Sequence, residues 1–193
     1  FSTNPIWTSA SDFNCFSVAF GDVNMDGLPD LACVAGESYN HIRQKYRVFR
    51  NVAGVLETTP YWQSAANHAA LDVTWGDVNG DGLLDLAFAG ESSGPGQPVD
   101  PLEVYLGTGT TLQDTPAWHS QDGHDYANTL SLGDLNGDGW LDLAVADNNQ
   151  NVGGVGNGRV KLFLNNGAGT LGNTPAWTSA FDGYGSHVSF ADA

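Results

Sequence analysis

The sequence predicts an all-β fold built from repeated four-stranded antiparallel units, and three observations carry this prediction. An aspartate-rich segment of nine residues occurs three times, beginning at Asp22, Asp77 and Asp134, so the repeats start 55 and then 57 residues apart. Short stretches in which apolar residues alternate with small or polar ones flank each copy, as β-strands do. No long helical period competes with them. Four short strands in a period near fifty residues are typical of β-propeller blades.

The four expected strands follow the same order in every repeat. The first strand runs into the aspartate-rich segment and the second leaves it. The third follows a variable loop, and the fourth carries a Pro-x-Trp-x-Ser marker that also occurs once ahead of the first repeat. The first three strands are expected at 18–21, 31–35 and 46–50, at 73–76, 86–90 and 102–106, and at 130–133, 143–146 and 160–164, and the markers lie at 5–9, 60–64, 116–120 and 175–179.

These markers predict one propeller segment of about three and a half blades. Residues 1–9 would be the outer strand of a preceding blade, 10–64, 65–120 and 121–179 three complete blades, and 180–193 the start of a further blade. Such a segment cannot close a ring by itself, and open blade faces and strand edges invite association. We therefore expect either that the chain is part of a longer protein or that copies assemble to complete the ring.

The recurring tryptophans have two interpretations. A Trp at 7, 62, 118 and 177 could offer a stacking platform for sugars, or it could be the residue that packs one blade on the next. Regular repetition favours packing.

The aspartate-rich segments have the oxygen spacing of a calcium loop. Carboxylate or amide oxygens fall at positions 1, 3, 5 and 9, glycine stands at position 6, and position 7 offers its backbone carbonyl. An EF-hand would also need a Glu at position 12 and flanking helices, whereas position 12 is Cys33, Phe88 or Val145 in strand-like surroundings. A plain Asx turn is the alternative, but a turn needs neither four spaced oxygens nor their repetition.

The pattern Gly-Asp-x-Asn-x-Asp-Gly-x-x-Asp-Leu-Ala, preceded by Phe20 and followed by Val34-Ala35-Gly36 in the first copy, resembles the FG-GAP repeat. That family includes the integrin α-subunit propeller, bacterial FG-GAP/VCBS-type secreted proteins and a fungal lectin. The resemblance covers nearly the whole chain and implies a seven-bladed propeller with Ca²⁺ between the two inner strands of each blade, about three ions in this chain. Ala191 and the incomplete fourth loop depart from the pattern. The implied ligands, with position 7 through its carbonyl, are Asp22, Asn24, Asp26, Leu28 and Asp30; Asp77, Asn79, Asp81, Leu83 and Asp85; and Asp134, Asn136, Asp138, Trp140 and Asp142.

Charge and composition narrow the class of partner. Six Lys and Arg stand against 22 Asp and Glu, and a net charge of −16 argues against nucleic acid or an anionic membrane as the partner. No apolar stretch approaches the roughly 20 residues that a membrane-spanning helix needs. Cys15 and Cys33 flank the first loop, where paired strands would bring them close, and either a disulfide or two small buried residues is open.

Function is expected in the loops at the end of the blades opposite the calcium-type loops, since variable loops on a rigid scaffold carry binding sites. We expect a secreted or cell-surface recognition or adhesion module, lectin-like in the broad sense, that binds a glycan or an extracellular protein. A self-assembling surface or fibre protein and the propeller part of a polysaccharide-acting enzyme are the alternatives, although no nucleophile motif points to catalysis. The loops in question are 10–14, 37–45, 65–70, 91–101, 121–128, 147–158 and 180–186.

Overall fold

The computed structural model describes residues 4–36, 42–91, 100–122, 126–148, 158–180, 183 and 185–191. Within these residues the protein contains strands, turns and bends but no helix, and so no helix that could cross a membrane. The strands are β1 (Cys15–Gly21), β2 (Asp30–Ala35), β3 (Arg47–Phe49), β4 (Asn51–Val52), β5 (Val55–Leu56), β6 (Trp62–Gln63), β7 (Ala70–Gly76), β8 (Asp85–Gly90), β9 (Glu103–Tyr105), β10 (Trp118–His119), β11 (Ala127–Gly133), β12 (Asp142–Asp147), β13 (Val160–Phe163) and β14 (Trp177–Thr178).

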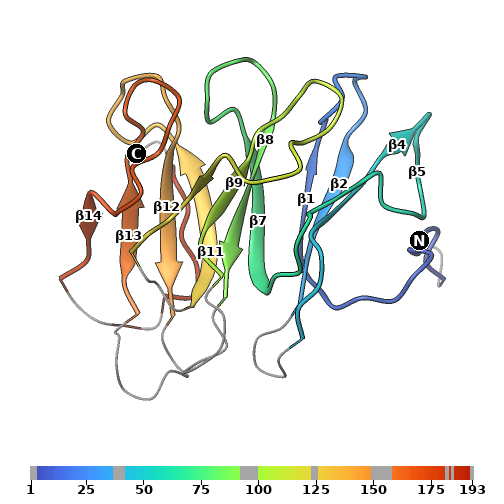
Figure 1. Ribbon diagram of the computed structural model, residues 1–193, viewed down its shortest axis with the longest axis horizontal. Coiled ribbons are helices and arrows are strands. Elements are labelled where there is room, and N and C mark those ends of the chain that lie inside the picture. The colour runs from blue at the N-terminus through green and yellow to red at the C-terminus, as the bar shows by residue number, and fades with distance from the viewer. Residues whose placement is uncertain are drawn as a thin grey trace.

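Three four-stranded antiparallel sheets repeat one topology. Their strand orders are β1-β2-β3-β6, β7-β8-β9-β10 and β11-β12-β13-β14, and each strand pairs antiparallel with its neighbour (Figure 1). Even the irregularity repeats, because the register shifts near the start of β1, β7 and β11 alike. A short hairpin, β4–β5, is added in the first repeat. The predicted all-β fold of four-stranded blades is confirmed, and we number the sheets blades 1, 2 and 3.

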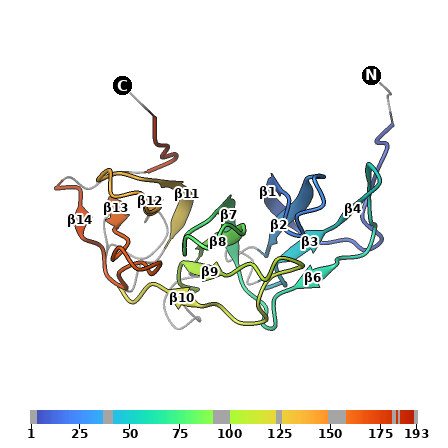
Figure 2. The same ribbon diagram turned by 90° about the horizontal axis from the view of Figure 1, so that it is seen from above.

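The blades stand side by side in an arc, with β1, β7 and β11 on its concave side (Figure 2). These inner strands contact one another from blade to blade, β1 with β7 and β7 with β11. The arrangement is that of a partial propeller.

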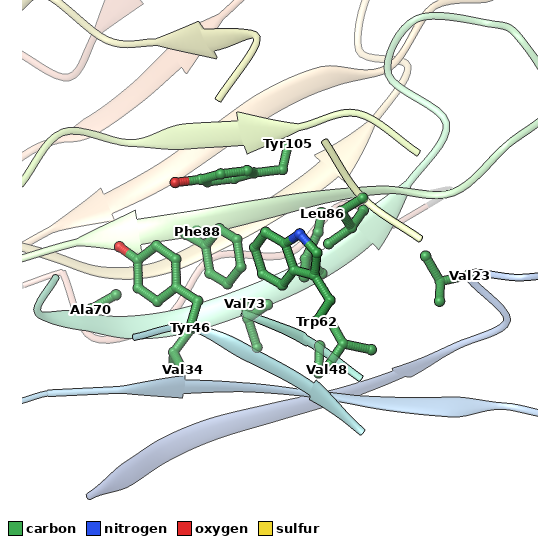
Figure 3. Close-up of a cluster of buried hydrophobic side chains, with 12 residues drawn as sticks. Val23, Val34, Tyr46, Val48, Trp62, Ala70, Val73, Leu86, Phe88 and Tyr105 are labelled. Carbon is green, nitrogen blue, oxygen red and sulfur yellow. The ribbon is translucent and has the colours of Figure 1, made fainter. Parts of the chain in front are cut away.

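Each second strand is buried along its whole length. In blade 2 this is because a neighbouring blade covers each side of β8. In β8 the alternation of a strand sends Leu86 and Phe88 toward blade 1, while Ala87 and Ala89 face blade 3. The large side chains of β8 therefore lie on its side toward blade 1, and its small side chains lie on its side toward blade 3. Figure 3 shows the cluster between blades 1 and 2, where Tyr46 stacks on Phe88 with ring centroids 3.9 Å apart.

The tryptophans pack one blade on the next, as repetition favoured. The ring of Trp7 meets Phe49 edge-on at 5.3 Å, Trp62 meets Tyr105 at 5.3 Å, and Trp118 meets Phe163 at 5.7 Å. In each pair the aromatic partner lies in the third strand of the following repeat. Trp177 is the fourth marker tryptophan, and 51% of its surface is exposed.

The side of a blade that contacts the preceding blade is here called its leading face. On blades 2 and 3 this face is buried, and Val73 and Leu130 are each 5% exposed. On blade 1 the equivalent Val18 is 52% exposed and Phe20 62% exposed. Trp7, Phe13 and Leu56 pack over the outer part of this face and cover Leu31, Cys33 and Phe49.

A disulfide joins Cys15 of β1 to Cys33 of β2, with Cα atoms 6.2 Å apart. This settles the alternative that the sequence left open. The bond lies on the leading face of blade 1, where blades 2 and 3 have apolar residues pressed against a neighbour. It closes a chain segment that contains the whole first aspartate-rich loop.

Candidate functional site

Loop 1 (22–30), loop 2 (77–85) and loop 3 (134–142) join the first and second strands of the three blades, at one end of the molecule (Figure 1). Their backbones fold alike. The carboxylate at position 1 accepts the N–H groups of positions 5 and 6, the Asn oxygen at position 3 accepts the N–H of position 5, and the carboxylate at position 5 accepts the N–H of position 7. All these distances lie between 2.8 and 3.1 Å.

Glycine at position 6 is required by the backbone. Gly27, Gly82 and Gly139 have φ angles of 85°, 84° and 90°, in the left-handed region that residues with a Cβ seldom adopt. Without this turn the chain could not bring the position 1 carboxylate onto the amides of positions 5 and 6.

The aspartate at position 9 has a role that the sequence did not reveal. Asp30, Asp85 and Asp142 are wholly buried. One carboxylate oxygen accepts the N–H of position 2 in its own loop, and the other accepts an N–H just after the third strand of the same blade. Asp85, for example, binds the N–H groups of Val78 and Gly107, each at 2.8 Å. This residue therefore fixes the loop to the rest of its blade, and the same pairs recur in loops 1 and 3.

Burial raises the pKa of Asp30 and of Asp85 above the ordinary carboxyl value, although the backbone N–H groups that they accept oppose the rise. Neighbouring loop carboxylates add to it: Asp26 acts on Asp30, and Asp81 acts on Asp85. Like charges crowded into one loop are a cost that a bound cation would relieve.

The donor set fits a hard divalent cation. Each loop contains three carboxylates, one amide oxygen and a backbone carbonyl at the predicted ligand positions within nine residues, with no nitrogen or sulfur ligand among them. In the described part of the chain, no three His, Cys, Asp or Glu side chains already converge as a metal site. The carboxylates at positions 1 and 5 accept N–H groups of their own loop, and the carboxylate at position 9 faces its blade. Carboxylate oxygens have further lone pairs for a metal.

The sequence-predicted ligands fall into two groups by exposure. Positions 1, 3, 5 and 7 are exposed or half-buried in all three loops, so solvent ions reach them, whereas position 9 is inaccessible. In loop 3 the side chains at positions 1 and 3, Asp134 and Asn136, are exposed, while their counterparts Asp77 and Asn79 of loop 2 are half-buried. Blade 3 lies over loop 2, where Asn165 donates a hydrogen bond to the Val78 carbonyl.

A buried charge cluster that sequence reasoning missed ties blade 1 to blade 2 at the opposite end. Arg43 forms two hydrogen bonds of 2.5 Å to the carboxylate of Asp100. His68 Nδ1 lies 3.3 Å from the same carboxylate and 3.7 Å from Glu103, whose Oε2 accepts the Tyr105 hydroxyl at 3.3 Å. Arg43 and His68 are far in sequence from Asp100 and Glu103, and the set does not repeat, so no sequence pattern predicted this cluster.

Three of the four basic residues of the first repeat, Arg43, Arg47 and Arg50, are engaged within the protein. Besides Arg43, Arg50 pairs with Glu57 at 3.0 Å, and the Arg47 guanidinium lies 4.3 Å from the centre of the Phe13 ring. In blade 3, Lys161 pairs with Asp122 and Asp147 at 2.9 and 2.7 Å. These contacts indicate that the basic side chains stabilise the fold.

The structure describes only part of the loops predicted to carry the binding face. Residues 37–41, 92–99, 123–125, 149–157, 181–182 and 184 lie outside the described residues. The described segments next to them, such as Gly36, Glu91 and Asn148, stand at the end of the second strands away from the aspartate-rich loops.

Fold and loops together define a β-propeller type of repeat, and comparison with known families agrees. The model of the FG-GAP-like repeat matches residues 22–88 and 77–145, which shows that the chain belongs to the FG-GAP repeat family. The family is generally non-enzymatic, and its propellers are often ligand-binding modules. The chain is also 32% identical over 126 residues to the uncharacterized protein YybI of Bacillus subtilis (strain 168). The match covers 57% of this chain and 48% of that protein, so the chain spans about half of YybI.

Proposed function

We propose that this chain is a calcium-stabilised extracellular recognition module that binds a glycan or protein ligand through the loops opposite loops 1–3. The observation that carries the proposal is the identical folding of three oxygen-rich loops at one end of three blades. A cation at each loop would neutralise crowded carboxylates and stiffen the hairpin of the inner strands. Calcium is thereby assigned a structural role, which leaves the other end free for recognition.

The disulfide supports the extracellular part of the proposal. Disulfides persist in oxidising compartments and are rare in the cytosol of mesophiles. Calcium loops of extracellular modules also bind with dissociation constants of about 10⁻⁴–10⁻³ M, which suits the calcium concentration outside cells. Both features favour the same compartment.

Calcium addition tests the proposal directly. Because only the folded loops present the oxygens, millimolar calcium should raise the melting temperature and a chelator should lower it. Asp81→Ala should reduce the rise by removing the position 5 ligand of loop 2. The matched control is Asp114→Ala, an exposed aspartate outside the loops, which should respond as the wild type does. An unchanged response in Asp81→Ala would remove loop 2 from the account.

Ligand recognition needs a separate test. The protein should retain selected glycans or extracellular proteins on an array, in the presence of calcium. Exchange of residues 92–99 for a short Gly-Ser linker, which keeps Glu91 and Asp100, should abolish that binding, while the calcium-dependent rise in melting temperature remains. Binding that survives exchange of residues 92–99 and of 149–157 would place the ligand elsewhere.

Self-assembly is a second candidate function, favoured by the leading face of blade 1. Val18 and Phe20 occupy the positions at which blades 2 and 3 receive a neighbour, yet they are exposed. We propose that another blade of the same type, from a longer chain or a second copy, covers them. Phe20→Glu should abolish concentration-dependent association measured by light scattering. The control is Tyr61→Glu, because Tyr61 is 38% exposed on the outer edge of the blade. Equal association in both variants would exclude this face.

A further inference from the structure

We propose that loops 2 and 3 bind calcium as a coupled pair and that loop 1 binds independently, with Trp140 and Asn165 as the link. This inference rests on the proposed calcium function and adds the regulation of the same sites. Three contacts between blade 3 and loop 2 carry it, and the corresponding contacts between blade 2 and loop 1 have different residues.

The first contact is made by Trp140, at position 7 of loop 3. Its indole ring lies against Gly80 of loop 2, so closely that a Cβ on Gly80 would stand 2.7 Å from the ring. Gly80 directly precedes Asp81, a predicted ligand. The backbone carbonyl of Trp140 is itself a predicted ligand of loop 3, so one residue belongs to one loop through its backbone and touches the other through its side chain.

The second contact is made by Asn165, just after β13. Its backbone N–H donates to Asp142 of loop 3 at 2.8 Å. Its buried side-chain amide donates to the carbonyl of Val78 in loop 2 at 3.0 Å and to that of Leu141 in loop 3 at 3.3 Å. Asn165 thus hydrogen-bonds to both loops.

The third contact joins Gly169, in the turn after β13, to the backbone of Asn79 at position 3 of loop 2. A Cβ on Gly169 would stand 2.8 Å from the Asn79 carbonyl oxygen. Loop 2 is therefore touched by blade 3 at three consecutive residues, 78, 79 and 80.

Loop 1 packs on blade 2 through Val23, which shares a buried cluster with Leu86 and Leu112, but the residues that correspond to Asn165 and Trp140 differ. The residue equivalent to Asn165 is Gly107. Its backbone N–H donates to Asp85, as that of Asn165 donates to Asp142, but it has no side-chain amide that could donate to loop 1. The residue equivalent to Trp140 is Leu83, and its side chain lies beside Gly107 and Gly109 of its own blade. The sequence itself therefore offers the substitutions that should uncouple loops 2 and 3.

Coupling follows because ordering either loop fixes groups that the other loop needs. A cation at loop 3 would hold the backbone of Trp140 and Asp142, and with it the ring and the amide that rest on loop 2. Thermodynamic linkage requires the effect to be equal in the other direction. Typical coupling between sites changes affinity about 5- to 150-fold.

The test uses calorimetric calcium titration of variants with loop 1 disabled by Asp26→Ala. Adding Asp138→Ala leaves loop 2 alone, and adding Asp81→Ala leaves loop 3 alone. The reference is the sum of the two single-loop isotherms, which describes loops that bind independently. We expect the protein with both loops to bind calcium with an affinity at least about fivefold higher than this reference gives. Asn24→Ala replaces Asp26→Ala if that variant fails to fold, as judged by circular dichroism in chelator.

Trp140→Leu combined with Asn165→Gly copies the residues of blade 2 and should reduce the two-loop isotherm to the sum of its parts. Loops 1 and 2, compared in the Asp138→Ala background, should also be additive. Additivity of loops 2 and 3 in the parent, or coupling that survives the double substitution, would overturn the inference while the calcium function stands. Absence of calcium binding in every variant, with no change in melting temperature, would overturn both.

Discussion

A single aromatic contact, repeated three times, holds neighbouring blades together. Trp118 is 5% exposed and meets Phe163 edge-on. Trp118→Ala should lower the free energy of unfolding by about 3–5 kcal/mol, because it leaves a cavity between blades. Trp177→Ala is the internal control, since Trp177 occupies the same place in the repeat but is 51% exposed; it should cost no more than about 0.5 kcal/mol. Chemical denaturation measures both, and equal effects would contradict the packing role.

Glu103 gives the stability a pH dependence. Burial raises the pKa of its carboxyl above the ordinary value, and nearby Asp100 adds to the rise, while His68 and the Tyr105 hydroxyl oppose it. The folded-state pKa therefore exceeds the unfolded one. The contribution of this group to stability is present below the unfolded value and is lost as pH rises through the folded value.

Glu103→Gln removes that titration and keeps an oxygen for the Tyr105 hydroxyl. Its melting temperature relative to the wild type should therefore increase from about pH 4 to about pH 7. Thermal melts over this range, in one buffer series with calcium absent, provide the measurement. A difference between the two proteins that does not change with pH would show that Glu103 does not titrate in this window.

Residue roles were predictable from the sequence where repetition exposed them. The tryptophans recur in step with the loops, and packing was the better interpretation for that reason. Spacing alone grouped Asp30, Asp85 and Asp142 with the other ligands, since it cannot show that a carboxylate turns back onto its own blade. The pair Arg43–Asp100 was unpredictable because its members belong to different repeats and occur once each.

Strands were predicted well where a run of apolar and small residues is long. β2, β8 and β12 begin at the last aspartate of each loop and are buried on both sides, so their apolar and small residues stand out. The fourth strands β6, β10 and β14 are only two residues long and were visible through their Pro-x-Trp-x-Ser marker. The β4–β5 hairpin was not predicted, because Asn51–Leu56 has too short a pattern to distinguish from a turn.

The disulfide shows the same limit at the level of one hairpin. Antiparallel pairing of the strands that flank loop 1 brings Cys15 and Cys33 within reach, yet two small buried residues would have fitted the sequence as well. The structure adds that the bond lies on the face where blade 1 has no complete neighbour. A covalent link there replaces part of the packing that blades 2 and 3 obtain from the blade before them.

Taken as a whole, the molecule is an arc of three blades whose two ends have different tasks in our account. Loops 1–3 at one end form a repeated, internally hydrogen-bonded set of oxygen donors, and the charge cluster of Arg43, His68, Asp100 and Glu103 joins two blades at the other. The period of the sequence predicted the arc, since identical units that stack on one another must follow one curve. The ligand could not be predicted, because its loops share no pattern.

The central claim is that each complete repeat holds one calcium ion, and equilibrium dialysis of the intact chain against calcium tests it most directly. At about 10 mM free calcium, well above the dissociation constants of about 10⁻⁴–10⁻³ M expected for extracellular modules, the protein should retain three ions per chain, and the Asp81→Ala variant two. Retention of no calcium above that of an unfolded control, at the same protein concentration, would contradict the account.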